Sequence, residues 1–345
     1  MNHMVFLSKT ETMRMWIKRL GQLSFRKVFY SFLVRQDVIL ATVLVLLIVI
    51  LSFSTQTFLT RNNWLNLMRN FAWIALAALG QSIVIITGGI DLSVGAVMAL
   101  ASVVTAFALT GGLPVSLSIT LGLAVGAFIG LVNGFFIAKV RLPAFITTLI
   151  TMSISRGMIF GLTQGWPVRD LPASFRALGF DFVLGNFLIP VSLVIALVLA
   201  LLVAFVMNNT VLGTYIFALG NSERAVVVAG VDHIRVKTLV YVMSGVLASV
   251  SGLLLTARLG VAAPTAAEGY ELSIIAAAVI GGASLFGGEG GVIGVLLGAA
   301  FIQVLNNALV LLGIAAHWQT AALGVAALVA LLADYFRRRK ILQEE

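Results

Sequence analysis

ITGGIDLSVGAVM, residues 86–98, lies between two long apolar runs in a chain that is apolar almost throughout. The pair Gly88-Gly89 breaks the backbone, a lone acid, Asp91, follows, and Ser93 precedes the next apolar run. Such a polar break is costly at membrane depth unless protein covers it or it lines a water-filled cavity. The segment therefore predicts a membrane protein with a path through it.

The composition of the chain agrees with a bilayer environment. The 345 residues are 60% hydrophobic and 10% charged, whereas soluble domains keep about a quarter of their residues charged. The chain has no cysteine and only three histidines, far apart in sequence, so we expect no metal site and no cofactor bound by this chain. The net charge of +9 lies mainly in tails beside apolar runs, which indicates a membrane surface rather than nucleic acid.

Ten apolar segments are candidates for spanning helices, although the eighth is short. We therefore expect an all-α polytopic membrane protein with about ten transmembrane helices. An even number of spans places both termini on the same side. The segments are 38–55, 66–86, 91–111, 115–138, 144–163, 187–207, 237–257, 272–285, 291–313 and 318–335.

The basic residues orient these spans. When both tails, the turn at 139–141 and the loop 208–236 with Lys237 at its end are cytoplasmic, 16 of the 22 Lys and Arg lie inside and four outside. Basic residues gather on the cytoplasmic side of membrane proteins, so both termini are expected inside. The predicted organisation is a basic tail at 1–37, a transmembrane domain at 38–335 and a short tail at 336–345.

Two glycine stripes predict close helix packing. Gly122, Gly126, Gly130 and Gly134 recur every four residues, as do Gly290, Gly294 and Gly298. This spacing places the glycines on one helix face, where another backbone can approach. A second glycine pair, at 281–282, echoes Gly88-Gly89 and suggests two related halves.

The break motif consists of Gly88, Gly89, Asp91, Ser93 and Gly95. Asp91 is expected at a helix start, where the helix dipole favours a carboxylate and Ser93 could share the capping. Asp91 then either only caps the helix or also acts as a gate near the cytoplasmic mouth.

The loop 208–236 holds a predicted short helix. Asn221 or Ser222 can cap it, Glu223 favours its first turn, Ala225 begins a small apolar face and Gly230 is a natural stop. A capped helix with such a face suits docking into a groove on another protein. An ordinary interfacial helix is the alternative.

Other polar residues could line a pathway or simply join helices. The candidates for pathway lining are Asn133, Arg156, Gln303 and Asn306. Arg156 should face the bundle or extend to the outer interface, and amides in spans often bond between helices. Glu268 and Glu271, with Arg258, are placed on outer loops, either in contact with a binding protein or solvated.

Four stretches together resemble the permease subunits of ABC importers for simple sugars, of the ribose, xylose and arabinose type. They are ITGGIDLSVGAVMAL (86–100), LPAFITTLITMSISRGM (142–158), ALGNSERAVVVAGV (218–231) and GYELSIIAAAVIGGASLFGGEGGVIGVLLGA (269–299). Ribose-type permeases resemble the chain most, and autoinducer-2 permeases share the same plan.

The resemblance implies a subunit of the bacterial cytoplasmic (inner) membrane that works with several partners. These are an ABC ATPase that uses ATP and Mg, a second permease, identical or homologous, and a periplasmic or extracellular sugar-binding protein. The loop helix would be the coupling helix, with Gly220, Asn221, Ser222, Glu223, Ala225 and Gly230 in the coupling loop. The chain itself has no G-x-x-x-x-G-K-[ST] run for a nucleotide.

Two other functions remain open at this point. A passive facilitator needs no ATPase, whereas proton coupling is disfavoured because Asp91 is the only acid expected inside a span. An intramembrane enzyme is less favoured still, because cysteine, clustered histidines and paired carboxylates are missing, and no catalytic residue is expected.

Overall fold

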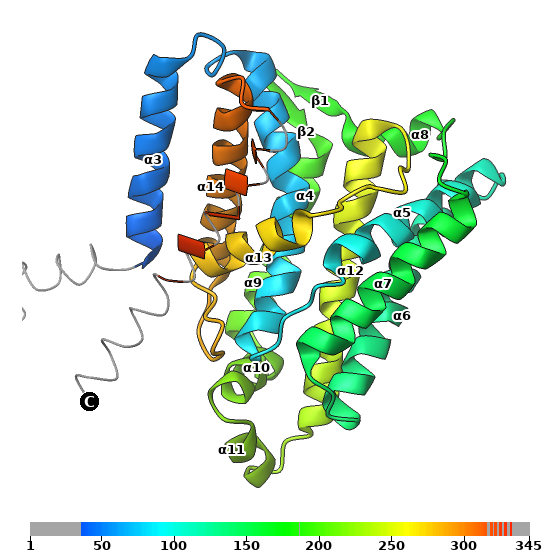
Figure 1. Ribbon diagram of the computed structural model, residues 1–345, viewed down its shortest axis with the longest axis vertical. Coiled ribbons are helices and arrows are strands. Elements are labelled where there is room, and N and C mark those ends of the chain that lie inside the picture. Colours follow the sequence, from blue (N-terminus) through cyan, green and yellow to red (C-terminus); the bar gives the residue numbers. More distant parts are fainter. Residues whose placement is uncertain are drawn as a thin grey trace, which may run out of the picture.

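The computed structural model describes residues 36–185 and 187–315, together with scattered residues between 318 and 332. Most of its helices run between two ends of the molecule (Figure 1). We call the end that carries α10 and α11 the hairpin end, and the end that carries α8, β1 and β2 the opposite end. The elements are α3 Gln36–Ser54, α4 Arg61–Ile86, α5 Val94–Thr110, α6 Val115–Gly134, the π-helix η1 Phe135–Lys139, α7 Ala144–Thr163, α8 Ala173–Arg176, the 3-10 turn η2 Ala177–Gly179, β1 Asp181–Leu184, β2 Phe187–Pro190, α9 Val191–Asn209, α10 Val211–Asn221, α11 Glu223–Val228, α12 His233–Leu259, α13 Tyr270–Ile280 and α14 Val292–Leu311.

The polytopic helical fold is confirmed. Seven helices of the described part are long and apolar enough to cross a membrane: α3, α4, α6 with η1, α7, α9, α12 and α14. Helices α5, α10 and α13 are apolar but shorter. Each of the first nine predicted segments coincides with a helix. The tenth, 318–335, and both tails lie largely outside the described residues, so the number of spans and the side of each terminus stay predictions.

One small sheet departs from the all-α prediction. Residues 187–190, predicted as the start of a span, form β2, which pairs antiparallel with β1. Pro190 then takes the N-cap position of α9. At the opposite end Arg69 donates from Nε to Asp181 at 3.0 Å, which fastens the β1–β2 pair to α4.

Two helices also differ from prediction at their glycine breaks, since α5 begins only at residue 94 and α13 already ends at residue 280.

Helix α12 forms the centre of the bundle, between α4, α5 and α6. A Cβ on Gly130 would lie 2.3 Å from the carbonyl oxygen of Tyr241, and one on Gly126 would lie 2.2 Å from that of Gly245. Glycine is therefore what allows the α6 and α12 backbones to touch. Gly298 packs against the α13 backbone in the same way. The structure confirms the packing role predicted for both stripes.

The outer surface of the bundle is apolar. Phe53, Phe128 and Leu201, on α3, α6 and α9, are 89%, 65% and 71% exposed. By contrast, α4 is enclosed by its neighbours, with an unbroken buried run over residues 72–86. A bundle that carries large exposed apolar side chains on its outer surface is suited to a lipid surrounding.

Candidate functional site

The break between α4 and α5 needs both of its glycines for different reasons. Gly88 has a φ of +79°, a left-handed conformation that glycine adopts without strain. Gly89 lies against α12, where a Cβ would be 2.4 Å from the hydroxyl oxygen of Tyr241. Thr148 of α7 stabilises the break from the other side, since its hydroxyl donates to Ile90 O at 3.2 Å and accepts from Leu92 N at 3.1 Å. Two peptide groups of the break are thus bonded to protein, whereas Gly88 is exposed.

Asp91 is an anchor inside the bundle. It is 4% exposed and accepts hydrogen bonds from Ser93 N at 2.9 Å, Ser93 Oγ at 2.5 Å and Ser244 Oγ at 3.3 Å. The amide of Gln81, turned so that its nitrogen donates, pairs with the backbone O and N of Asp91 at 3.0 and 3.2 Å. Asp91 thereby ties the break to both α4 and α12.

The capping predicted for this acid is wrong in one respect. Helix α5 begins at Val94, and its N-cap residue, Ser93, makes no side-chain cap hydrogen bond in the described structure. The Ser93 hydroxyl instead donates to Asp91, so it is not available to the first turn of the helix. Gly95 follows in that turn, and a Cβ there would be 2.5 Å from Glu271 Oε1. The absence of a side chain at Gly95 therefore lets α5 approach α13.

Asn133 joins helices rather than facing open space. It is 1% exposed, donates to Ser93 Oγ at 3.0 Å and accepts from Thr151 Oγ1 at 2.6 Å. Of the two interpretations of this residue, the geometry favours interhelical bonding. Of the other predicted pathway residues, Gln303 lines an apolar groove between α3, α4 and α14, and Asn306 lies three residues further along α14.

Arg156 faces protein near the opposite end. Its guanidinium donates to Ala266 O at 3.0 Å and lies 3.5 Å from Glu271 Oε1, with side-chain exposures of 15% and 11% for the ion pair. The outer-loop position predicted for Glu271 is wrong, because this residue is buried in the first turn of α13. Arg258 is likewise engaged within the bundle, where it bonds Asn70. Glu268 is exposed, as predicted for an outer loop.

At the hairpin end, α10 and α11 form two consecutive capped helices. The Ser222 side chain accepts from Ala225 N at 3.3 Å and caps α11, while Gly230, with a φ of +79°, ends it. Both predictions for this helix are confirmed. Asn221, the other candidate cap, instead donates to Phe217 O at 3.1 Å. The sequence interpretation missed α10, although Thr210, which caps it by accepting from Gly213 N at 3.3 Å, is a recognisable signal.

Helices α10 and α11 together form the hairpin, which contacts two glycine breaks. The first break joins α4 to α5, and the second is the loop between α13 and α14. A Cβ on Gly220 would lie 1.9 Å from Ile86 O, just before the first break, and 2.3 Å from Gly288 N, in the second. Gly288 N in turn donates to Ile86 O at 2.9 Å. A displacement of the hairpin would therefore act on the end of α4 and on the loop between α13 and α14.

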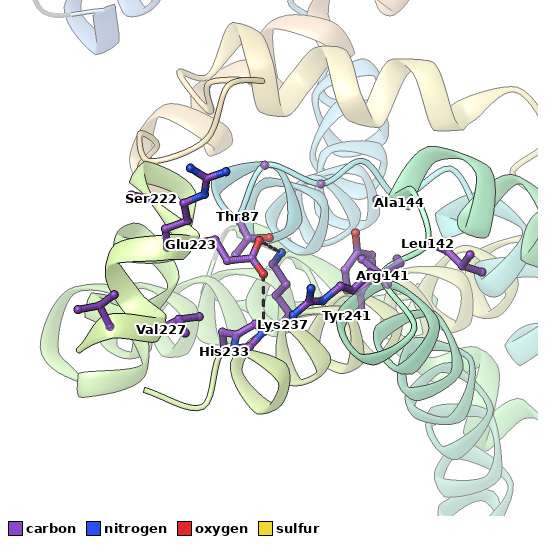
Figure 2. A pocket seen from close by; sticks show the side chains of 15 residues that line it. Thr87, Arg141, Leu142, Ala144, Ser222, Glu223, Val227, His233, Lys237 and Tyr241 are labelled. Carbon is purple, nitrogen blue, oxygen red and sulfur yellow. Dashed lines mark hydrogen bonds and ion pairs between the residues drawn. The ribbon is translucent and has the colours of Figure 1, made fainter. Parts of the chain in front are cut away.

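A cavity of about 860 Å³ opens beside α11. Figure 2 shows Glu223 at its edge, with dashed lines to Lys237 and His233. Burial raises the pKa of the Glu223 carboxyl, but the hydrogen bond and charge of Lys237, with the charges of His233 and Arg141, outweigh burial and hold this pKa below its usual value. The lining consists of Thr87, Gly88, Gly89, Ile137, Arg141, Leu142, Ala144, Ser222, Glu223, Arg224, Val227, Val228, His233, Lys237 and Tyr241.

A bundle of apolar helices with broken inner segments and a capped hairpin at one end is the architecture of a multi-pass membrane protein. Residues 63–332 match the family described as branched-chain amino acid transport system / permease component, and the chain belongs to this family. It is a transport subunit and not an enzyme.

Curated relatives agree with the family and confirm the resemblance found in the sequence. The ribose import permease protein RbsC of Haemophilus influenzae is 40% identical over 309 residues, which cover 88% of this chain and 94% of the relative. RbsC of Bacillus subtilis is 41% identical over 84% of this chain and 90% of its own length. The fructose import permease protein FrcC of Rhizobium meliloti is 34% identical over 79% and 78%. No solved structure matches the chain.

Proposed function

We propose that this chain is the permease subunit of an ATP-driven importer that moves a simple sugar, a pentose or hexose, into a bacterial cell across the cytoplasmic membrane. Relatives named as ribose and fructose import permeases, each aligned over most of this chain, support the substrate class. The alignment includes the break at 86–98 and the hairpin, so the proposal concerns the whole transmembrane domain.

The observation that carries the proposal is the position of Gly220 between Ile86 O and Gly288 N. A hairpin that touches both glycine breaks is placed to pass a force from a docked ATPase into the bundle interior. Val228, 88% exposed on α11, gives the hairpin an apolar tip that a groove on the ATPase can cover. ATP and Mg are bound by that partner. A second permease, identical or homologous, completes the passage, and a sugar-binding protein delivers the solute at the opposite end.

The test is reconstitution of the complex. The chain is copurified with its ATPase and binding protein, inserted into liposomes, and supplied with ATP and a panel of pentoses and hexoses. The proposal expects one of these sugars, with the binding protein, to raise ATP hydrolysis and to accumulate on the cytoplasmic side. Accumulation that does not depend on ATP, or a complex that no sugar in the panel stimulates, would count against it.

A further inference from the structure

One face of α12 carries side chains that contact both the hairpin and the first glycine break. His233, Lys237, Tyr241 and Ser244 follow one another at intervals of four, four and three residues, which places them on one side of a helix. We call these four residues the α12 face. From Lys237 to Ser244 the helix rises by about 10 Å, at roughly 1.5 Å per residue.

The lower part of the α12 face holds α11. Lys237 Nζ donates to Glu223 Oε2 at 2.6 Å, and His233 Nε2 lies 3.8 Å from Glu223 Oε1. The Lys237 and His233 side chains are only 17% and 15% exposed, whereas that of Glu223 is 46% exposed. Glu223 is the first residue of α11. The first turn of the docking helix is therefore fastened to α12 by a bond that is partly shielded from water.

The upper part of the α12 face holds the break. The hydroxyl of Tyr241 lies against Gly89, where it leaves no room for a Cβ. One turn further on, Ser244 Oγ donates to Asp91 Oδ2 at 3.3 Å. Both α12 side chains are 1% exposed. The Tyr241 hydroxyl has no hydrogen-bond partner among the described residues, so its contribution here is contact.

We infer that the α12 face is a rigid connection that transmits displacement of α11 to the break at Gly89 and Asp91, with Glu223 and Lys237 as its positioning residues. This inference rests on the proposed function, because it assumes that α11 docks on the ATPase. A helix transmits motion along its axis when it is held tightly at both points of contact. The close contact of α12 with the glycines of α6 fixes its position in the bundle.

The neighbouring Asp232–Arg235 ion pair provides a matched control. Arg235 Nε lies 2.8 Å from Asp232 Oδ2, but the Arg235 and Asp232 side chains are 85% and 49% exposed, and the pair joins two residues at the start of the same helix. Exposed pairs of this kind contribute little. Asp232→Asn and Arg235→Gln change charge at the same end of α12 without affecting the connection to α11.

The experiment uses the absence of cysteine from the chain. Thr87→Cys places a single thiol on this chain in the cavity beside the break. In the complex purified with its ATPase, the rate of maleimide labelling of this thiol is measured with and without ATP, by mass spectrometry of this chain. Uptake of radiolabelled ribose and ATP hydrolysis are recorded in parallel.

We expect ATP to change the labelling rate in the parent, and Glu223→Gln or Lys237→Met to reduce this change by roughly 2- to 30-fold, the range for residues in a coupling network. The double variant Glu223→Gln/Lys237→Met should lose no more than either single variant, because both remove the same bond. All variants should still copurify with the ATPase, and the control pair should retain the full change.

Three results would overturn the inference. The first is an ATP-dependent change in labelling rate that Lys237→Met leaves intact. Glu223 would then act through the ATPase alone and not through its bond to Lys237. The second is an equal loss in the Asp232 or Arg235 variants. The third is a parent complex whose Thr87→Cys thiol does not respond to ATP. A parent that responds to ATP but transports none of the pentoses and hexoses of the panel, ribose included, would count against the proposed substrate class and leave the connection supported.

Discussion

Replacement of Gly130 by alanine is expected to force α6 and α12 apart. The new Cβ would lie 2.3 Å from Tyr241 O and 2.7 Å from Val242 Cα, both backbone atoms, against 3.4 Å or more for ordinary contact. One helix must therefore move by about 1 Å, and overpacking of this kind costs about 1–3 kcal/mol. Because α12 carries the contacts to Glu223 and Asp91, a change in its position should also impair transport.

Gly161→Ala on α7 is the matched control. Nothing lies within 4 Å of the Cβ position at Gly161. Both variants gain the same intrinsic helix propensity, about 0.8–1 kcal/mol for alanine over glycine, so the difference between them isolates the crowding at Gly130. The assay is reversible unfolding in mixed micelles, with the free energies compared under one condition. If Gly130→Ala proves as stable as Gly161→Ala, the close contact between α6 and α12 has been misjudged.

Three further predictions concern other polar contacts. Glu271→Gln leaves the part-buried guanidinium of Arg156 without its counter-ion and should cost about 1.5–3 kcal/mol in the same assay, as loss of a hydrogen bond between charged groups does; an unchanged stability would mean that the pair is solvated. Asn133→Leu removes two interhelical hydrogen bonds and should cost about 1–3 kcal/mol, with the midpoint of thermal unfolding as the check and a neutral result as the contrary outcome. The pKa of Glu223 is lowered in the folded chain, so its ionised form stabilises the fold above its ordinary value of 4.5 and this contribution is lost as the pH falls through the folded pKa. The difference in unfolding temperature between the parent and Glu223→Gln should therefore be present at pH 7 and shrink below pH 4.5, and a difference that grows on acidification would contradict this assignment.

Local patterns predicted the features that depend on near neighbours. Apolar length placed nine helices, a four-residue glycine period predicted a close-packing face on α6, and the cap at Ser222 and stop at Gly230 placed α11. In each case the cause lies within a few residues of the feature itself. The helix α10 was missed because its apolar residues had been assigned to a loop on the basis of their position between two spans.

Contacts between distant segments could not be predicted in this way. Arg156 and Glu271 are separated by 115 residues, and the local sequence around either residue does not indicate its partner. An arginine inside a span needs a partner that offsets its charge, but Glu271 was predicted on an outer loop, so the pair was not foreseen. Asp91 was expected at the break, but its bond to Ser244, 153 residues away, depends on how α12 packs.

The most direct test of the account is solute accumulation by the purified chain alone. Vesicles that contain this protein without any ATPase are given radiolabelled sugar and internal ATP, and the internal concentration is followed past equilibrium with the medium. We predict that the internal sugar concentration never exceeds the external one in these vesicles. Once the ATPase and the binding protein are added, the internal concentration should rise above the external one. Uphill accumulation without the ATPase would contradict the central claim that energy enters through the hairpin from a separate protein.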